Sequence, residues 1–193
     1  MKTPNLKNNE NLWMLLIKGD ADSLEIIYKD FYDLLLNYGL KMYPNQEFVE
    51  DCIQDLFIKI YQSKQLNPTS SVRSYLLKSI RNMIRERLSA EKNLEQIDEQ
   101  AFKIEEPCNY EEIRFAHDDK DLQLKKKLIH SYNRLSENQR MIVYLRYVRG
   151  LSHEEIANIV GINRQSSMNA SSRILAKLRE LLQDGTTSKK AKP

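Results

Sequence analysis

The sequence predicts an all-α protein with two helical domains joined by an acidic linker. Apolar residues recur at three- and four-residue steps through most of both halves, and no strand-type alternation is sustained anywhere. The 193 residues include only 5 glycines and 5 prolines, which favours helices over a loop-rich or all-β fold. An acidic stretch without a sustained apolar stripe separates the two helical halves.

The N-terminal domain is predicted over residues 12–88 and contains amphipathic helices. Their apolar stripes run over residues 24–38, 48–61 and 72–84, and the last helix is expected from Val72 to Leu88. Pro68 disfavours helical backbone at the residue before it, so a polar loop is predicted between the last two helices.

The C-terminal domain is predicted over residues 122–182 as a compact set of helices. Ser136 with Gln139, and Ser152 with Glu155, each match a capping box, in which the two side chains satisfy exposed backbone amides. The run "MIVYLRYV" between them is predicted as a buried helix that stops at Gly150.

Charge is distributed unevenly along the chain, although the net charge is only +3. Residues 1–72 carry −3, residues 73–92 carry +4, residues 93–121 carry −7 and residues 122–193 carry +9. Two basic blocks separated by an acidic one indicate two nucleic-acid-facing surfaces, with ordinary solvated faces as the alternative. The intervening region is interpreted as an acidic linker over residues 89–121, and residues 183–193 as a disordered basic tail.

The sequence carries no enzyme signature. His117, His130 and His153 are isolated from any partner at metal-ligand spacing, and no phosphate-binding glycine loop is present. We therefore predict a protein that is not an enzyme and takes no metal or cofactor. Cys52 and Cys108 show no paired spacing, and no apolar run suits a membrane span or a secretory signal. These features predict a cytoplasmic protein.

Three cations on the last N-terminal helix indicate binding of a nucleic-acid strand. Lys78, Arg81 and Arg85 are spaced so that they share a face away from the apolar stripe. Tyr75 stands one turn earlier, and the polar loop 64–71 leads into the helix. Cations beside an aromatic ring can hold a phosphate backbone and stack an unpaired base. The alternative is a solvated face with a core tyrosine.

The segment from Arg149 to Ile174 has the pattern of a helix-turn-helix. Ser152 can cap a helix that buries the small residue Ala157 where another helix would cross closely. Gly161 can end that helix in the left-handed conformation, and Asn163 can cap the next one. This order of residues is typical of DNA-binding helix pairs, with a helical hairpin that does not bind DNA as the alternative.

Together the two halves resemble bacterial RNA polymerase sigma factors of the extracytoplasmic-function class. The segment "FVEDCIQDLFIKIYQ" resembles the family's core-polymerase-binding helix, and "SVRSYLLKSIRNMIRERL" resembles the helix that melts and reads the −10 element. In the C-terminal half, "LSENQRMIVYLRYVRGLSHEEIANIVGI" resembles the start of the domain that reads the −35 element, and "QSSMNASSRILAKLRELL" resembles its recognition helix. The resemblance covers residues 12–88 and 122–182, and its details favour the branch common in Bacteroidetes.

The resemblance implies a sigma factor that binds core RNA polymerase and directs promoter-specific transcription initiation by recognising and melting promoter DNA. Core polymerase would be bound by Asp51, Gln54, Asp55, Phe57, Ile58 and Tyr61. The melted −10 strand would be bound by Lys64, Asn67, Ser71, Arg73, Tyr75, Lys78, Arg81, Asn82 and Arg85. The double-stranded −35 element would be bound by Ser152, His153, Arg164, Gln165, Ser166, Asn169, Ser172, Arg173 and Lys177. The linker would thread polymerase channels that otherwise hold RNA, and an anti-sigma factor is a further candidate partner.

The recognition helix departs from the family on its buried face. At about 100° per residue, Ser167 and Ser171 fall on the same face as Ile174 and Leu178, where the family usually carries apolar residues. Their hydroxyls could bond back to carbonyls four residues earlier. Each serine still forfeits on the order of 1–2 kcal/mol of apolar burial. We therefore expect a DNA-reading domain that is marginally stable alone, and cooperative melting of the fragment 122–193 at high temperature would contradict this.

Two other functions fit parts of the pattern. A helix-turn-helix regulator of the LuxR type would bind DNA without being a polymerase subunit, but it requires a sensor or receiver domain upstream. The N-terminal half has neither strands nor an acidic phosphorylation pocket. A helical adaptor, such as an anti-sigma mimic, would bind proteins only. That function predicts no DNA contact from Arg81, Arg85, Asn169 or Arg173.

Overall fold

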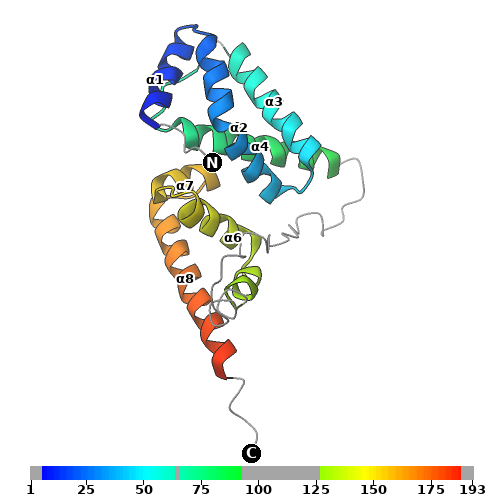
Figure 1. Ribbon diagram of the computed structural model, residues 1–193, viewed down its shortest axis with the longest axis vertical. Helices are drawn as coiled ribbons and strands as arrows, with labels where there is room; N and C mark the ends of the chain where they lie inside the picture. The colour runs from blue at the N-terminus through cyan, green and yellow to red at the C-terminus, as the bar shows by residue number, and fades with distance from the viewer. Residues whose placement is uncertain (1–5, 64–65, 93–126, 188–193) are drawn as a thin grey trace, which may run out of the picture. The chain divides into compact units, whose positions relative to one another are not determined.

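The computed structural model describes residues 6–63, 66–92 and 127–187 of the chain (Figure 1). Every regular element in these ranges is a helix, as the sequence predicts. The chain divides into two units, which are described separately: α1 to α4 form the N-terminal unit, and the helices after residue 126 form the C-terminal unit. Among the helices of these ranges, none has the length and apolar character needed to cross a membrane.

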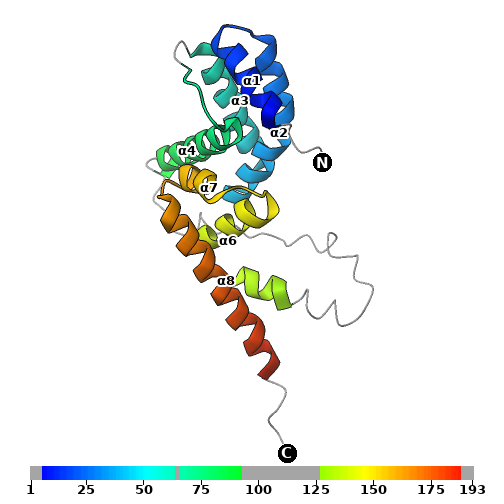
Figure 2. The ribbon, with the colours of Figure 1, turned by 90° about the vertical axis from the view of Figure 1, so that its left-hand side faces the viewer.

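The N-terminal unit is built from α1 (Leu6–Ile17), α2 (Asp22–Met42), α3 (Gln46–Gln62) and α4 (Val72–Lys92). Helix α2 packs against α1 on one side and α3 on the other, and α4 runs across them (Figures 1 and 2). The four helices share one apolar core, whose fully buried side chains include Trp13, Ile27, Phe31, Leu35, Ile53, Leu76 and Ile80. Burial of these large apolar side chains is the main favourable term in the folding of the unit.

Helix α1 is not among the helices predicted from the sequence, and it begins before residue 12, where the N-terminal domain was expected to start. Polar residues occupy most of its first half, so the local apolar pattern indicates helix only weakly. Tertiary packing holds the helix instead: Leu12, Trp13 and Leu16 are all buried on one face. Trp13 is only 1% exposed.

The junction of α2 and α3 depends on two residues. Asn45 caps α3, because its side-chain oxygen accepts a hydrogen bond of 3.0 Å from the backbone N–H of Phe48. Gly39 lies where the two helices approach most closely, and a Cβ at that position would clash with the side chain of Val49. The sequence of the turn therefore sets where α3 begins, and the glycine allows it to pack tightly against α2.

The C-terminal unit begins with helical residues 127–133 and continues with α6 (Glu137–Val143), η3 (Tyr144–Val148), α7 (His153–Val160) and α8 (Arg164–Thr187). Both predicted capping boxes are present, one at the start of α6 and one at the start of α7. The core of the unit comes from α6, η3, α7, α8 and the connections between the helices, and it includes Leu135, Ile142, Leu145, Leu151, Ile156 and Ile174.

The run "MIVYLRYV" forms a continuous helix, as predicted, but its second half is a π-helix. In this half the backbone N–H of Arg149 donates to the carbonyl oxygen of Tyr144 at 3.0 Å, a step of five residues. Gly150 follows with a φ of 66° and ends the helix. The prediction of a buried helix is right for Ile142, Tyr144 and Leu145 and wrong for Tyr147 and Val148, which are exposed.

Helices α7 and α8 form the predicted helix-turn-helix. Gly161 adopts a left-handed φ of 81°, and its N–H donates to the carbonyl oxygen of Ala157 at 2.9 Å. Asn163 caps α8, because its side-chain oxygen accepts from the N–H of Ser166 at 2.7 Å. Ala157 is buried, as expected of a small residue at a close helix crossing.

Two helices run beyond the predicted domain ends. Helix α4 continues to Lys92, so residues 89–92 are helical rather than the start of the linker. Helix α8 continues to Thr187, past residue 182, into the segment predicted as a disordered tail. Once a helix has formed, each further residue adds a backbone hydrogen bond, so a helix can extend beyond the last residue of its apolar stripe. The rest of the predicted linker, residues 93–121, lies outside the described residues.

Candidate functional site

A groove lies between α2 and α3 in the N-terminal unit. It is lined by Leu24, Tyr28 and Tyr32 from α2 and by Glu50, Asp51, Gln54, Phe57, Ile58 and Tyr61 from α3. The structure thus brings together five of the six residues that the sequence predicts for polymerase binding. The α2 residues were missed as site residues, and the spacing of Tyr28 and Tyr32, one helical turn apart, was the available signal.

The floor of the α2–α3 groove is aromatic. The rings of Tyr28 and Phe57 meet edge to face, with centroids 4.9 Å apart and planes at 80°. Phe57 is buried, whereas Tyr28, Ile58 and Tyr61 are 38%, 42% and 66% exposed. Large exposed apolar side chains clustered on neighbouring helices are typical of a surface that binds another protein.

The wall of the groove is acidic and polar. Glu50 accepts hydrogen bonds from the Tyr32 hydroxyl at 3.1 Å and from Gln46 Nε2 at 2.8 Å. Burial, together with the hydrogen bond to Glu50, raises the pKa of the Tyr32 hydroxyl, so this group remains a hydrogen-bond donor. Asp51 and Gln54 are exposed beside this pair. The groove therefore offers a partner an apolar centre with an acidic and amide-bearing edge.

Asp55, the sixth residue predicted for polymerase binding, lies outside the groove lining. Its carboxylate forms an ion pair with Arg87 of α4, whose guanidinium lies 6.0 Å from the ring centroid of Phe48. The position of Asp55 therefore suits a link between α3 and α4. Cys52, one turn earlier, is buried and free, and burial raises the pKa of its thiol. Cys108 lies outside the described residues.

The outer face of α4 carries four of the nine residues predicted for the −10 strand. At about 100° per residue, Tyr75, Lys78, Asn82 and Arg85 share the face opposite Ile80, and all four are exposed. The residues lining a shallow hollow on this face are Asn82, Arg85, Glu86, Ser89 and Ala90.

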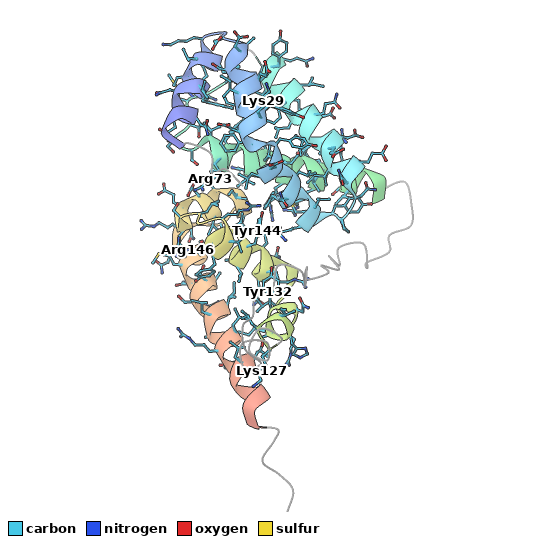
Figure 3. The ribbon with its side chains drawn as sticks, viewed as in Figure 1. Lys29, Arg73, Lys127, Tyr132, Tyr144 and Arg146 are labelled. Carbon is cyan, nitrogen blue, oxygen red and sulfur yellow. The ribbon has the colours of Figure 1, made fainter. Side chains whose placement is uncertain are left out.

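Arg81 and Arg73 lie differently from the other cations of α4. Arg81 is half-buried at the edge of the outer face. Arg73, labelled in Figure 3 at the start of α4, falls on the side of the helix that carries Ile80 and is also half-buried. The sequence predicted Arg81 on one exposed face with Lys78 and Arg85, but in the structure Arg81 lies at the edge of that face and is less exposed than the other two.

The loop from Ser63 to Ser71 connects α3 with α4 and leads onto this face. Asn67 is exposed, and its carbonyl oxygen accepts a hydrogen bond of 3.0 Å from Trp13 Nε1. Ser71 caps α4, because its hydroxyl accepts from the backbone N–H of Ser74 at 3.2 Å. Tyr75 is 37% exposed, so it is not the core tyrosine of the alternative interpretation. Lys64 lies outside the described residues.

The predicted recognition helix α8 presents a polar face to solvent. Its exposed residues on this face are Gln165, Ser166, Asn169, Ser172 and Arg173. Gln165 Nε2 donates to Asn169 Oδ1 at 3.0 Å, so two exposed amides, each with a donor and an acceptor group, are paired on this face. Arg164 is exposed at the beginning of the helix. Paired amides suit base edges in a major groove, and arginines suit the phosphate backbone.

Three residues predicted for the −35 element also hold the C-terminal unit together. The Ser152 hydroxyl caps α7 by accepting from the N–H of Glu155 at 3.2 Å. His153 is half-buried, and its Nδ1 lies 3.3 Å from the hydroxyl of Ser167. Lys177 is half-buried, and its Nζ donates to Gln139 Oε1 at 3.3 Å. Any DNA contact from these side chains is therefore combined with a structural role.

The buried face of α8 contains both serines that the sequence places there. Ser167 is fully buried and Ser171 nearly so. The expected bonds back to carbonyls four residues earlier are absent: Ser167 bonds to His153, and the Ser171 hydroxyl has no hydrogen-bond partner in the described part of the chain. A second helix supplies the partner of Ser167, which helical spacing within α8 does not reveal.

We expect Ser171→Ala to stabilise the C-terminal unit. Removing a buried hydroxyl that lacks a partner relieves a desolvation cost of about 1–3 kcal/mol. The exposed neighbour Ser172→Ala is the control, because both changes add the same helix propensity of about 0.5 kcal/mol. Thermal and urea unfolding of the full chain, followed by circular dichroism, measure the difference. An Ser171→Ala transition that lies below that of Ser172→Ala would contradict the prediction.

We expect the stability of the C-terminal unit to fall in mild acid because of His153. Burial, and then the charges of Arg146 and Arg164, lower the pKa of His153 from its ordinary value of 6.5. Arg146 comes from η3, beside α7 (Figure 3). The unfolded chain therefore binds more protons than the folded one, so the contribution of His153 is complete above pH 6.5 and is lost as the pH falls through the lowered value.

Urea unfolding at pH 7.5 and at pH 5.5 measures this loss. His153→Gln should reduce the pH dependence of the C-terminal transition, because glutamine cannot take up a proton. His130→Gln, which changes an exposed histidine of the same unit, should leave the dependence as it is in the original protein. An unchanged slope in His153→Gln would disprove the assignment.

Within the described ranges, no three or more histidine, cysteine, aspartate or glutamate side chains come together as ion ligands.

The described residues form a helical protein of two units, with an apolar and acidic groove in the first and a helix-turn-helix in the second. Residues 27–93 match the model of Sigma-70 region 2, and residues 126–178 match that of Sigma-70, region 4. The two matches together cover more than half of the chain, in the family's order. The chain belongs to the sigma-70 family, and it is an RNA polymerase sigma factor for promoter-specific transcription. Sigma factors are generally not enzymes.

Individual relatives agree with this family. The RNA polymerase sigma factor CarQ of Myxococcus xanthus is 26% identical over 165 residues, which are 85% of this chain and 91% of CarQ. CnrH, solved in complex with the cytosolic domain of CnrY, has a TM-score of 0.59 at 18% identity and covers 91% of this chain and 97% of its own. The sigma factor RpoE from Bartonella quintana, solved with the anti-sigma factor NepR, has a TM-score of 0.55 at 21% identity, with 82% and 96% covered. The two solved structures share the fold.

Proposed function

We propose that each of the three surfaces binds a different ligand during promoter recognition. The α2–α3 groove binds core RNA polymerase, the outer face of α4 with its loop binds the melted −10 strand, and the polar face of α8 reads the −35 element. The observation that carries this proposal is that each exposed surface has the chemistry of its ligand: apolar and acidic in the groove, basic and aromatic on α4, and amide-bearing on α8.

The division also assigns roles within each surface. In the groove, Ile58 and Tyr61 supply exposed apolar area, while Asp55 holds α3 to α4. On α4, Lys78 and Arg85 attract phosphates, and Tyr75 offers its ring to an unpaired base. On α8, Gln165, Ser166, Asn169 and Ser172 face base edges, with Arg164 and Arg173 beside them for the backbone.

Further parts of the proposal rest on the family and on the relatives. Because RNA synthesis belongs to the polymerase, the chain itself is not an enzyme and takes no cofactor. It acts in the cytoplasm, where the polymerase and the promoter are. Since RpoE of Bartonella quintana was solved with an anti-sigma factor, a similar partner is a candidate here. The Bacteroidetes-like branch and the acidic linker stay predictions from the sequence.

Reconstituted transcription tests the proposed function against its rivals. The full chain is mixed with core RNA polymerase and a library of promoter fragments, and the transcripts are sequenced. Transcripts that start at defined sites, and only when the chain is present, are the expected result. Co-purification with polymerase but no transcripts would instead support the protein-binding adaptor. Sequence-specific DNA binding without polymerase would support the helix-turn-helix regulator.

A further inference from the structure

One side chain of α1 ties down the loop between α3 and α4. Trp13 Nε1 donates a hydrogen bond of 3.0 Å to the carbonyl oxygen of Asn67, which is 54 residues further along the chain. The indole ring also packs against the ring of Tyr75, with centroids 4.9 Å apart and planes tilted by 58°. A single buried residue therefore contacts both the loop and the aromatic residue that begins the outer face of α4.

The neighbouring residues restrain the loop from its other end. Pro68 limits the backbone of Asn67 to extended conformations. Beyond it, the hydroxyl of Thr69 accepts a hydrogen bond of 3.2 Å from the backbone N–H of Ser71, and Ser71 caps α4. Helix α1 thus anchors the loop on one side of Pro68, and the beginning of α4 anchors it on the other.

Trp13 fixes the backbone of Asn67 and the ring of Tyr75, while the Asn67 side chain and part of the Tyr75 ring stay exposed. Trp13 bonds to the carbonyl oxygen of Asn67, so the amide side chain of Asn67, which is exposed, is not consumed by this contact. Tyr75 keeps 37% of its surface exposed although one side of its ring packs on the indole. Trp13 itself is too deeply buried to touch DNA.

We propose that Trp13 is a positioning residue that pre-organises Asn67 and Tyr75 for capture of an unpaired promoter base. This inference rests on the proposed role of the loop and α4 in binding the melted −10 strand. A base that stacks on Tyr75 and bonds to Asn67 requires the two groups to keep a constant separation. Trp13 holds that separation before DNA arrives, so less conformational freedom is lost when the base binds.

The test measures −10 preference with holoenzyme assembled from the full chain and core RNA polymerase. Promoter fragments randomised at the −10 element are transcribed, and the enrichment of each sequence is determined. Trp13→Phe keeps an aromatic ring against Tyr75 and removes the N–H donor together with part of the buried volume of the indole. Loss of one neutral hydrogen bond is expected to reduce the enrichment ratio of preferred over single-substituted elements by about fivefold. Trp13→Leu, which also removes the aromatic ring that packs against Tyr75, should reduce it further.

Two measurements separate positioning from a general loss of stability. Affinity for core polymerase should be unchanged in Trp13→Phe, because the α2–α3 groove does not include Trp13. Leu16→Ala, which truncates another buried residue of α1, should lower the melting temperature but keep the −10 enrichment ratio.

The possible failures are distinguishable. If the original holoenzyme enriches no −10 sequence, the proposed function of the loop and α4 is wrong, and the role of Trp13 falls with it. If the original holoenzyme shows a preference and Trp13→Phe shows the same one, only the positioning role is overturned. An equal loss of preference in Leu16→Ala would also overturn it, because general destabilisation would then explain the effect.

Discussion

Truncating the two most exposed apolar side chains of the α2–α3 groove is expected to raise the Kd for core RNA polymerase by about 100-fold. Ile58 and Tyr61 are 42% and 66% exposed and lie together on the groove lining. Truncating one side chain at the centre of a protein interface to alanine weakens the binding free energy by on the order of 1–2 kcal/mol. Each 1.4 kcal/mol corresponds to about a tenfold change in Kd. Anisotropy titration of the fluorescently labelled Ile58→Ala/Tyr61→Ala variant with core polymerase measures the change.

The chain offers a matched control for this double variant. Met14 and Leu15 of α1 are 41% and 44% exposed, and neither lines the groove. Met14→Ala/Leu15→Ala therefore removes comparable exposed apolar area from the same unit, and it should bind core polymerase like the original protein. Equal weakening by the two double variants would show that the groove is not the docking site. Circular dichroism melting checks that both variants remain folded.

Replacing Asn169 by alanine is expected to weaken −35 recognition by about 5- to 150-fold at its preferred base. A bidentate amide contact to a base edge contributes about 1–3 kcal/mol of discrimination. Asn169 is exposed on α8, and Gln165 holds its Oδ1 at 3.0 Å, so the amide is oriented before DNA binds. Binding of holoenzyme to promoter fragments with every single substitution in the −35 element measures affinity and base preference together.

Arg173→Ala and Asn138→Ala complete this experiment. If Arg173 contacts phosphate, Arg173→Ala should weaken binding to all −35 sequences alike. It should also lower the slope of the logarithm of the binding constant against the logarithm of the salt concentration by about one. Asn138 is an exposed amide on α6 rather than on α8, and Asn138→Ala should leave both affinity and preference unchanged. An Asn169→Ala variant that retains the original base preference would exclude this amide from reading DNA.

Local sequence predicts the helix-turn-helix in detail. The caps of α7 and α8 and the left-handed glycine between them depend on residues within four positions of one another. The polar face of α8 follows equally directly, because helical periodicity alone separates Asn169 and Arg173 from the face of Ser167. The partner of Ser167 did not follow from the sequence, because His153 is 14 residues away on another helix.

The residues predicted for polymerase binding all lie on α3, and the structure places five of them on the groove lining and Asp55 outside it. Helical spacing on α3 cannot show that Tyr28 of α2 completes the groove, since that depends on how α2 and α3 pack. Nor can it show that Arg87, 32 residues further on, pairs with Asp55 and draws it away from the groove lining. The resemblance to sigma factors implied the set of α3 residues, and packing decided which of them line the groove.

The sequence by itself determined the all-α class, most helices, the caps of α6, α7 and α8, and the polar or basic character of the faces of α4 and α8. These features depend on periodicity and capping, which act within a few residues of the chain. Only the tertiary structure decided that α1 is a helix and that Trp13 anchors the loop before α4. Burial of an indole and a hydrogen bond across 54 residues bring together segments that no local pattern relates.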